Sequence, residues 1–248
     1  MIPKRIHSVW LGGGELPPVA RRCMASWRAC MPDWEYAHWD EESVRRYCER
    51  TGTASPLDIP YVRQACQAGR YAFASDAVRL WALREMGGVY LDVDFEVYRS
   101  FETLLGNEAF AGYEGSKRSP VMMGVIASEA DGVWVSDLLR QYEGRGFLLP
   151  DGTMDLTTNT LFFTRYMQAN GLVCDGREQV FNGLHIYPVD YFSPRLTTGE
   201  YRRTERTFCE HCNMDSWGGG KTWKSRVAGL LPHGVRAAVI KLKRKWFG

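Results

Sequence analysis

The 248-residue sequence has no apolar run near the roughly 20 residues that cross a bilayer, which argues against a membrane-spanning helix. Its first residues, MIPKRIHSVW, lack the charged and then apolar stretch of a secretory leader. Its seven cysteines are an odd number and are scattered, so they do not predict a disulfide framework. We therefore expect a reducing, cytoplasmic setting.

Two common site motifs are also incomplete. The turn LGGGELPP, residues 11–18, is not followed by Gly-Lys-Ser/Thr, which excludes a phosphate-binding P-loop. Cys209 and Cys212 flank His211, but no second cysteine pair follows at the spacing of a four-ligand zinc site. The sequence therefore does not predict structural zinc.

Basic residues are concentrated at one end of a chain whose net charge is only +2. Residues 221–248 contain eight Lys and Arg residues, no acidic residue, and interleaved apolar side chains. This composition suits peripheral contact with an anionic membrane surface, and it equally suits a helix packed on the core. We expect a catalytic domain over residues 1–220 and an amphipathic tail over 221–248. The tail lacks the aromatics of a nucleic-acid-binding motif, so we expect no nucleic-acid partner.

Strand and helix patterns alternate along the chain, which predicts an α/β fold with a mostly parallel sheet covered by helices. The predicted strands span residues 4–10, 35–39, 87–97, 121–128 and 185–192. The predicted helices span residues 20–30, 40–50, 73–86, 133–143 and 158–170.

Two carboxylates interrupt the apolar stretch GGVYLDVDFEV, residues 87–97. Side chains alternate along a strand, so Asp92 and Asp94 are expected on the same side as Tyr90. Burying two close anions costs several kcal/mol unless a cation stands opposite, and Mg²⁺ or Mn²⁺ binds such oxygen ligands. The alternative is a pair of surface acids, because a bare Asp-x-Asp is common by chance.

The preceding helix carries a second charged pair. Asp76 and Arg79 are three residues apart and share a helix face with Leu80 and Leu83. They could form a surface ion pair worth a few tenths of a kcal/mol. Alternatively, Arg79 faces phosphate oxygens and Asp76 accepts hydrogen bonds from sugar hydroxyls, close to Asp92 and Asp94 across the glycine turn.

The segment ASDAVRLWALREMGGVYLDVD, residues 74–94, resembles the signature of the DXD-containing glycosyltransferases of family 32. That family includes bacterial capsule and lipooligosaccharide transferases and yeast initiation mannosyltransferases, with the glucosylating clostridial toxins as distant relatives. IPKRIHSVWLGG (2–13) and HCNMDSW (211–217) resemble the family's first strand and its late segment.

This resemblance implies a nucleotide-binding GT-A fold and a metal-dependent hexosyltransferase. The donor would be a nucleoside diphosphate sugar, with a UDP-sugar favoured. The acceptor would be a hydroxyl of a glycan or a lipid-linked oligosaccharide, and transfer would retain the anomeric configuration. Trp10 would stack on the base, while Asp76 and Arg79 would hold the donor sugar and phosphate.

The resemblance also implies the metal site, which would take Mn²⁺ or Mg²⁺. Asp94 would be the principal metal ligand, and Asp92 would contact ribose, sugar or metal. His211 would be a second metal or phosphate ligand. Ser216 and Trp217 would close over the diphosphate.

Two other functions remain open from the residues alone. A phosphohydrolase could use Asp92 as its nucleophile. The Asp-x-Asp motif of such enzymes has Thr or Val two residues after the second Asp, where this chain has Glu96. A non-catalytic protein could bind sugar nucleotides or glycans with the same pocket. We expect a glycosyltransferase acting in the cytoplasm or at the inner membrane face.

Overall fold

The computed structural model describes residues 1–115, 120–194, 201 and 203–212. They fall within one compact unit, Met1–Asn213. Ser216, Trp217 and the predicted basic tail lie outside the described residues. Among the described helices, none combines the length and apolar character needed to cross a membrane.

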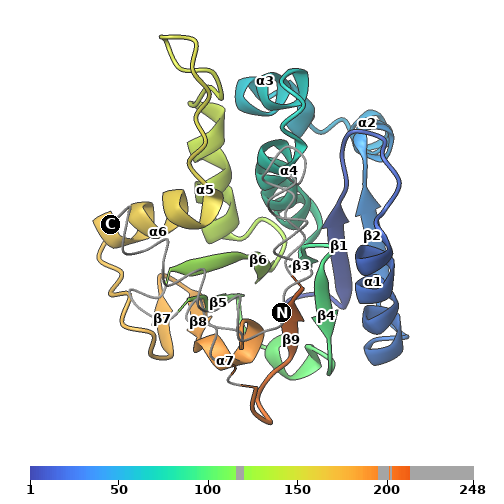
Figure 1. Cartoon of the computed structure of the whole chain (residues 1–248), viewed down its shortest axis with the longest axis vertical. Helices are drawn as coiled ribbons and strands as arrows, with labels where there is room; N and C mark the ends of the chain where they lie inside the picture. The colour runs from blue at the N-terminus through green and yellow to red at the C-terminus, as the bar shows by residue number, and fades with distance from the viewer. Residues whose placement is uncertain (116–119, 195–200, 202, 213–248) are drawn as a thin grey trace, which may run out of the picture. The chain divides into compact units, whose positions relative to one another are not determined.

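A seven-stranded sheet forms the centre of the unit, in the order β2-β1-β3-β6-β5-β8-β7 (Figure 1). Its strands are β1 (Arg5–Val9), β2 (Glu35–Trp39), β3 (Gly88–Leu91), β5 (Ala109–Tyr113), β6 (Val121–Ser128), β7 (Gln179–Phe181) and β8 (Leu184–Tyr187). β6 and β7 run antiparallel to their neighbours, and the other five strands share one direction. This confirms the predicted, mostly parallel sheet. The carboxyl ends of those five strands meet at one edge, where open α/β sheets bind ligands.

Helices connect the strands and cover the sheet. They are α1 (Pro18–Cys30), α2 (Glu41–Thr51), α3 (Pro60–Gln67), α4 (Tyr71–Met86), α5 (Val133–Glu143), α6 (Asn159–Ala169) and α7 (Val189–Phe192). Two short 3₁₀ turns span Pro56–Asp58 and Glu102–Leu104. Local chemistry sets helix ends: Asp40 and Ser43 form a capping box at the start of α2, and Gly52 ends it in the left-handed conformation.

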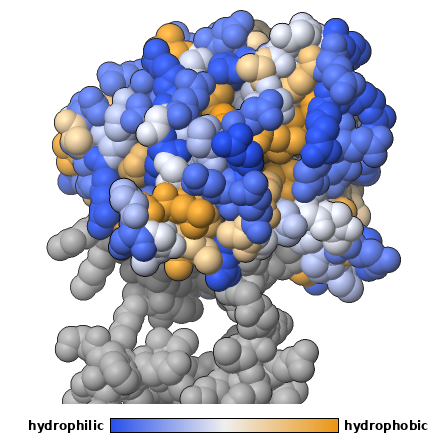
Figure 2. Space-filling view, turned by 90° about the horizontal axis from the view of Figure 1, so that it is seen from above, coloured by the Kyte–Doolittle hydropathy of each residue, from blue (hydrophilic) through white to orange (hydrophobic). Residues whose placement is uncertain are grey.

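The sheet separates two apolar cores because side chains alternate along its strands. On β3, Tyr90 packs into the core with Trp81 of α4. Val89 packs on the other face with Trp27 of α1. The outer surface seen from above is mostly hydrophilic, with apolar side chains gathered in two places (Figure 2).

The predicted strand over residues 87–97 is wrong in one respect. β3 ends at Leu91, and Asp92–Asp94 form a turn in which Phe95 N donates to Asp92 O at 3.1 Å. The chain then enters β4 (Phe95–Val97), which pairs with β9 (Cys209–His211) in a separate two-stranded sheet. A turn, and not strand alternation, therefore brings Asp92 and Asp94 together.

The predicted strand over residues 185–192 is also too long. β8 ends at Tyr187, and α7 follows Pro188. Proline has no N–H to continue the strand ladder, and it suits the start of a helix.

Candidate active site

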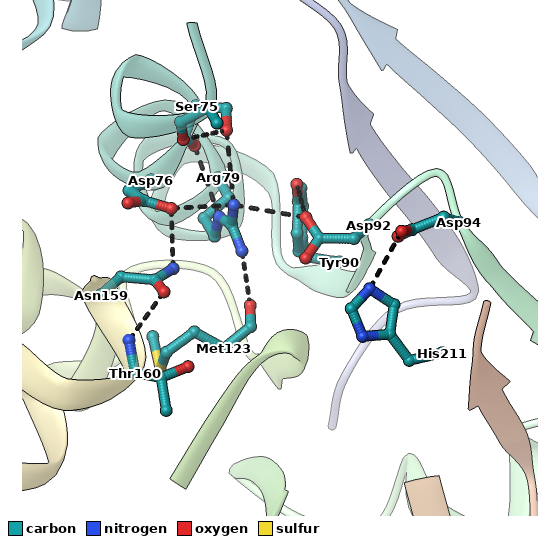
Figure 3. Close-up of polar contacts among 11 residues, drawn as sticks. Ser75, Asp76, Arg79, Tyr90, Asp92, Asp94, Met123, Asn159, Thr160 and His211 are labelled. Atoms are coloured by element: carbon teal, nitrogen blue, oxygen red, sulfur yellow. Dashed lines mark hydrogen bonds and ion pairs between the residues drawn. The ribbon is translucent and has the colours of Figure 1, made fainter. Parts of the chain in front are cut away.

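The ion pair on α4 is buried. Asp76 is 1% exposed and Arg79 is 3% exposed. Nη2 of Arg79 lies 2.9 Å from Asp76 Oδ1, and its Nη1 donates to Met123 O on β6 at 2.7 Å (Figure 3). Burial raises the pKa of Asp76 to about 8, against the opposing effect of Arg79. The surface ion pair that the sequence left open is therefore excluded.

The same guanidinium holds Asp92 at the carboxyl end of β3. Nη2 of Arg79 lies 3.3 Å from Asp92 Oδ1, to which the Tyr90 hydroxyl also donates at 2.7 Å (Figure 3). The backbone N of Asp92 donates to Gly124 O at 2.9 Å. A Cβ at Gly124 would lie only 2.8 Å from Asp92 Oδ2, so the close approach of β6 requires glycine. The Asp92 side chain is 31% exposed, and no described residue donates to its Oδ2.

Asp94 and His211 meet across the small β4–β9 sheet. Nε2 of His211 lies 3.0 Å from Asp94 Oδ2, and the imidazole stacks on Phe95 at a centroid distance of 4.7 Å (Figure 3). Cys212 N donates to Asp94 O at 2.8 Å. The structure thus brings together Asp92, Asp94 and His211 from segments more than a hundred residues apart in sequence.

The charges of this cluster influence each other. Burial raises the pKa of Asp92, and the charge of Asp94 adds to this, while Arg79 and Tyr90 oppose it. Burial alone would lower the pKa of His211, but its hydrogen bond to Asp94 and the nearby carboxylates outweigh burial and raise it. Excess negative charge therefore favours a cation at this place.

The donor atoms fit Mg²⁺ or Mn²⁺ bound together with a diphosphate. No group of three His, Cys, Asp or Glu residues in the described part of the chain forms a ready-made metal cage. Mg²⁺ does not need one, because it usually binds one or two carboxylates plus phosphate oxygens and waters. Asp92 Oδ2 and the Asp94 carboxylate, with His211 alongside, supply that set.

Trp10 lies just beyond β1, which runs parallel to β3. It is therefore at the same edge of the sheet as Asp92. Its indole N donates to Gly14 O at 2.6 Å, and its ring is half-buried. This placement is compatible with a surface for a nucleotide base.

Two residues of the site were not predicted from the sequence. Asn159, at the start of α6, is buried and donates from Nδ2 to Asp76 Oδ1 at 2.7 Å (Figure 3). Glu114 follows β5 and interacts with Thr160, Asp92 and His211, and burial raises its pKa. Only the position of Asn159 after a helix-capping Thr could have drawn attention to it, since its partner is 83 residues away.

Comparison with known proteins agrees with this geometry. Residues 17–111 match the family described as "Glycosyltransferase sugar-binding region containing DXD motif". Inositol phosphoceramide mannosyltransferase 3 of Schizosaccharomyces pombe is 31% identical over 108 residues, which cover 42% of this chain and 27% of that protein. The chain thus spans only about a quarter of that relative's length.

Two further matches cover most of the chain. An uncharacterized glycosyltransferase, L373, of Acanthamoeba polyphaga mimivirus is 21% identical over 88% of this chain and 84% of its own. The structure of mouse xyloside xylosyltransferase 1 superposes with a TM-score of 0.50 and 12% identity, covering 86% of this chain and 98% of that one. That level of identity shows the fold alone. Residues 17–111 of this chain therefore resemble the DXD-containing sugar-binding region of glycosyltransferases, and the chain has a GT-A fold.

Proposed function

We propose that this chain transfers a hexose from a nucleoside diphosphate sugar, with a UDP-sugar favoured, to a hydroxyl of a glycan or lipid-linked oligosaccharide. We further propose that the reaction requires Mn²⁺ or Mg²⁺ and retains the anomeric configuration. One observation carries the proposal: the turn between β3 and β4 holds Asp92 and Asp94 beside His211, at the carboxyl edge of the central sheet.

Asp94 and Asp92 Oδ2 would hold the cation together with phosphate oxygens, and His211 would lie beside them. When bound, the metal supplies positive charge to the leaving diphosphate. The Oδ2 atom of Asp92 is held in a fixed position because Arg79 and Tyr90 both contact Oδ1 of the same carboxylate. Groups that are already oriented need little rearrangement during the reaction, and this makes electrostatic stabilisation effective.

Arg79 fits a positioning role better than a direct contact with phosphate. Its guanidinium is buried and makes polar contacts with Ser75, Asp76, Asp92 and Met123. We propose that it acts through Asp92. Asp76, held by Asn159 on its other side, would fix the wall of the donor sugar pocket.

Retention by front-face attack of the acceptor, with the departing diphosphate as base, needs no enzymic nucleophile. Glu114 is the carboxyl to examine as a covalent nucleophile, because it is buried and close enough for its charge to influence Asp92 and His211. Incubation with a slow donor analogue followed by mass spectrometry tests both routes. A covalent glycosyl adduct on Glu114 would exclude front-face attack.

A nucleotide-sugar panel tests the proposal. Each donor is screened for thermal stabilisation and for slow hydrolysis, with Mn²⁺ and with a chelator. We expect Asp94→Asn to reduce turnover on the order of a hundredfold or more. Asp137→Asn is the control, because Asp137 lies on α5 and pairs with exposed Arg140. Phosphate release from simple phosphoesters would instead indicate a hydrolase, and donor binding without turnover a binding protein.

A lipid-linked acceptor is consistent with the yeast relative, which is an inositol phosphoceramide mannosyltransferase by name. We propose that the basic tail, 221–248, contacts the anionic inner face of the membrane and places the cytoplasmic domain near such acceptors. A chain truncated at Lys221 should then lose binding to anionic vesicles. Equal binding by the truncated and full chains would refute the tail's role.

A further inference from the structure

Two thiols from distant parts of the chain lie beside the active site. Sγ of Cys23, on α1, is 3.7 Å from Sγ of Cys212, although the residues are 189 positions apart. Cys23 is buried and Cys212 is half-buried. Two other cysteines differ in their contacts: the Cys30 thiol lies against Val97 O, and the Cys209 thiol lies against Phe192 O.

The thiol pair is connected to the proposed metal ligands through the backbone. Cys212 directly follows His211, and its N–H donates to Asp94 O at 2.8 Å. A displacement of Cys212 therefore acts on both sides of the Asp94–His211 contact. The residue also begins the segment that leads to Ser216 and Trp217.

The surroundings of the pair favour sulfur chemistry over metal binding. Arg22 Nη2 lies 3.7 Å from Cys212 Sγ, and Cys212 Sγ lies 3.9 Å from Glu96 Oε2. A guanidinium at this distance opposes the binding of a metal cation. The three candidate ligands here, two thiols and one carboxylate, do not form a metal-binding group within the described residues.

We propose that Cys23 and Cys212 are a modification site, a dithiol that a small-molecule disulfide such as oxidised glutathione converts into an intramolecular disulfide that slows sugar transfer. The accessible Cys212 thiol loses its proton to water and attacks the oxidant, which releases one glutathione thiolate. The Cys23 thiol then loses its proton, attacks the Cys212 sulfur and releases the second glutathione thiolate. Two protein thiols are oxidised and one disulfide is reduced to two thiols, so the exchange balances.

Closing the bond requires the sulfurs to approach from 3.7 Å to about 2.05 Å. Because Cys23 is buried on α1, whereas Cys212 is half-buried just after β9, most of the movement falls on Cys212. The bond would pull His211 and Cys212 toward α1 and disturb the Asp94–His211 contact. The predicted effect on sugar transfer rests on the proposed function, whereas bond formation does not.

The first arm of the test measures the bond itself. The full chain is equilibrated with oxidised and reduced glutathione, its free thiols are counted, and the disulfide is mapped by mass spectrometry. We expect the loss of two of the seven thiols and a peptide linking Cys23 to Cys212. Cys212→Ser should abolish this linkage, and Cys30→Ser, a change on the same helix, should leave it intact. Absence of the linkage in the unmutated chain, or its loss in Cys30→Ser, would overturn the proposal.

The second arm measures the consequence. Oxidation should weaken Mn²⁺ binding and donor hydrolysis by about tenfold, as changes around metal ligands commonly do, and dithiothreitol should restore both. Cys212→Ser should be insensitive to the oxidant. A mapped disulfide with unchanged Mn²⁺ affinity would refute the switch. A reduced chain with no donor turnover would instead count against the proposed function, and Mn²⁺ affinity would still decide the question of the switch.

Discussion

The two halves of the candidate site differ in how firmly they are held. Asp76 and Arg79 lie on α4, Asp92 directly follows β3, and their polar contacts run into the protein interior. Asp94 directly precedes β4 and His211 ends β9 of the two-stranded sheet; the Asp94 side chain is 7% exposed and that of His211 is 34% exposed. We call the first half the fixed foundation, because the Asp76–Arg79 pair is almost fully buried, and the second the adjustable half, because only two short paired strands carry it. Loss of the buried Arg79 should therefore strongly destabilise the protein, whereas changes in the second half should mainly alter catalysis.

The largest effect should follow the loss of the buried cation. Arg79→Met leaves Asp76 and Asp92 without their shared partner, so we expect the free energy of unfolding to fall by about 3 to 5 kcal/mol. Urea denaturation measures this. Arg84→Met is the control, since Arg84 pairs with its neighbour Glu85 near the surface, and should cost less than about 1 kcal/mol. Equal losses in the two variants would contradict a fixed foundation.

Gly124 tests the tight fit of β6 against the first half. In Gly124→Ala the new methyl group meets Phe95 at 2.7 Å and Asp92 Oδ2 at 2.8 Å. We expect the free energy of unfolding, measured by urea denaturation, to fall by about 1 to 3 kcal/mol, and metal-dependent turnover to weaken. Gly144→Ala is the matched control, because its Cβ would meet no atom within 4 Å. If the two variants behaved alike, the close packing around Asp92 would be disproved.

His7, a buried residue of β1 in the central sheet, makes the stability of the fold depend on pH. Trp39 Nε1 donates to its Nδ1 at 3.0 Å, so Nε2 carries the hydrogen and donates to Gly87 O at 2.8 Å. Burial lowers the pKa of His7 from 6.5 to about 4, because the charged imidazolium would lose its hydration. The unfolded chain then binds more protons, so stability falls as pH falls from about 6.5 toward 4.

Because of His7, the free energy of unfolding should be lower at pH 5 than at pH 7 by on the order of 2 kcal/mol. Urea denaturation at both pH values measures it. His7→Gln keeps a side-chain donor for Gly87 O but does not titrate, so its stability should change less between the two pH values. A variant with the same pH dependence as the unmutated chain would show that His7 is not the group responsible.

The adjustable half should give the smallest change in stability. His211→Gln removes the imidazole beside Asp94, and we expect donor turnover to fall about tenfold. The free energy of unfolding should change by less than about 0.5 kcal/mol, because the side chain is partly exposed. A large drop in the free energy of unfolding would show that His211 stabilises the fold as Arg79 does, and the two halves of the site would then not differ.

Strong periodic patterns predicted much of the fold. β2, β6 and α5 have the predicted bounds, since their patterns are unbroken and end at turn or capping residues. The turn at Asp92–Asp94 could not be predicted, because Val93 continues the strand pattern and tertiary pairing with β9 decides where β4 begins. The sequence predicted that Asp76, Arg79, Asp92 and Asp94 would lie close together.

The rest of the site depends on contacts between distant residues. The sequence could not decide between a surface and a buried Asp76–Arg79 pair, since helix spacing is the same for both. Asn159 and Cys212 find their partners 83 and 189 residues away, and no local pattern encodes such pairings. The resemblance had suggested that His211 lies in the site, and the structure adds its contact with Asp94.

Mn²⁺ binding measured by electron paramagnetic resonance, with and without UDP, tests the central claim most directly. We predict that UDP strengthens Mn²⁺ binding to the unmutated chain, and that Asp94→Asn and Asp92→Asn each weaken it by about tenfold or more. Both variants should remain folded in circular dichroism. If the double variant still bound Mn²⁺ and UDP as tightly as the unmutated chain, the two carboxylates would not be the cation site.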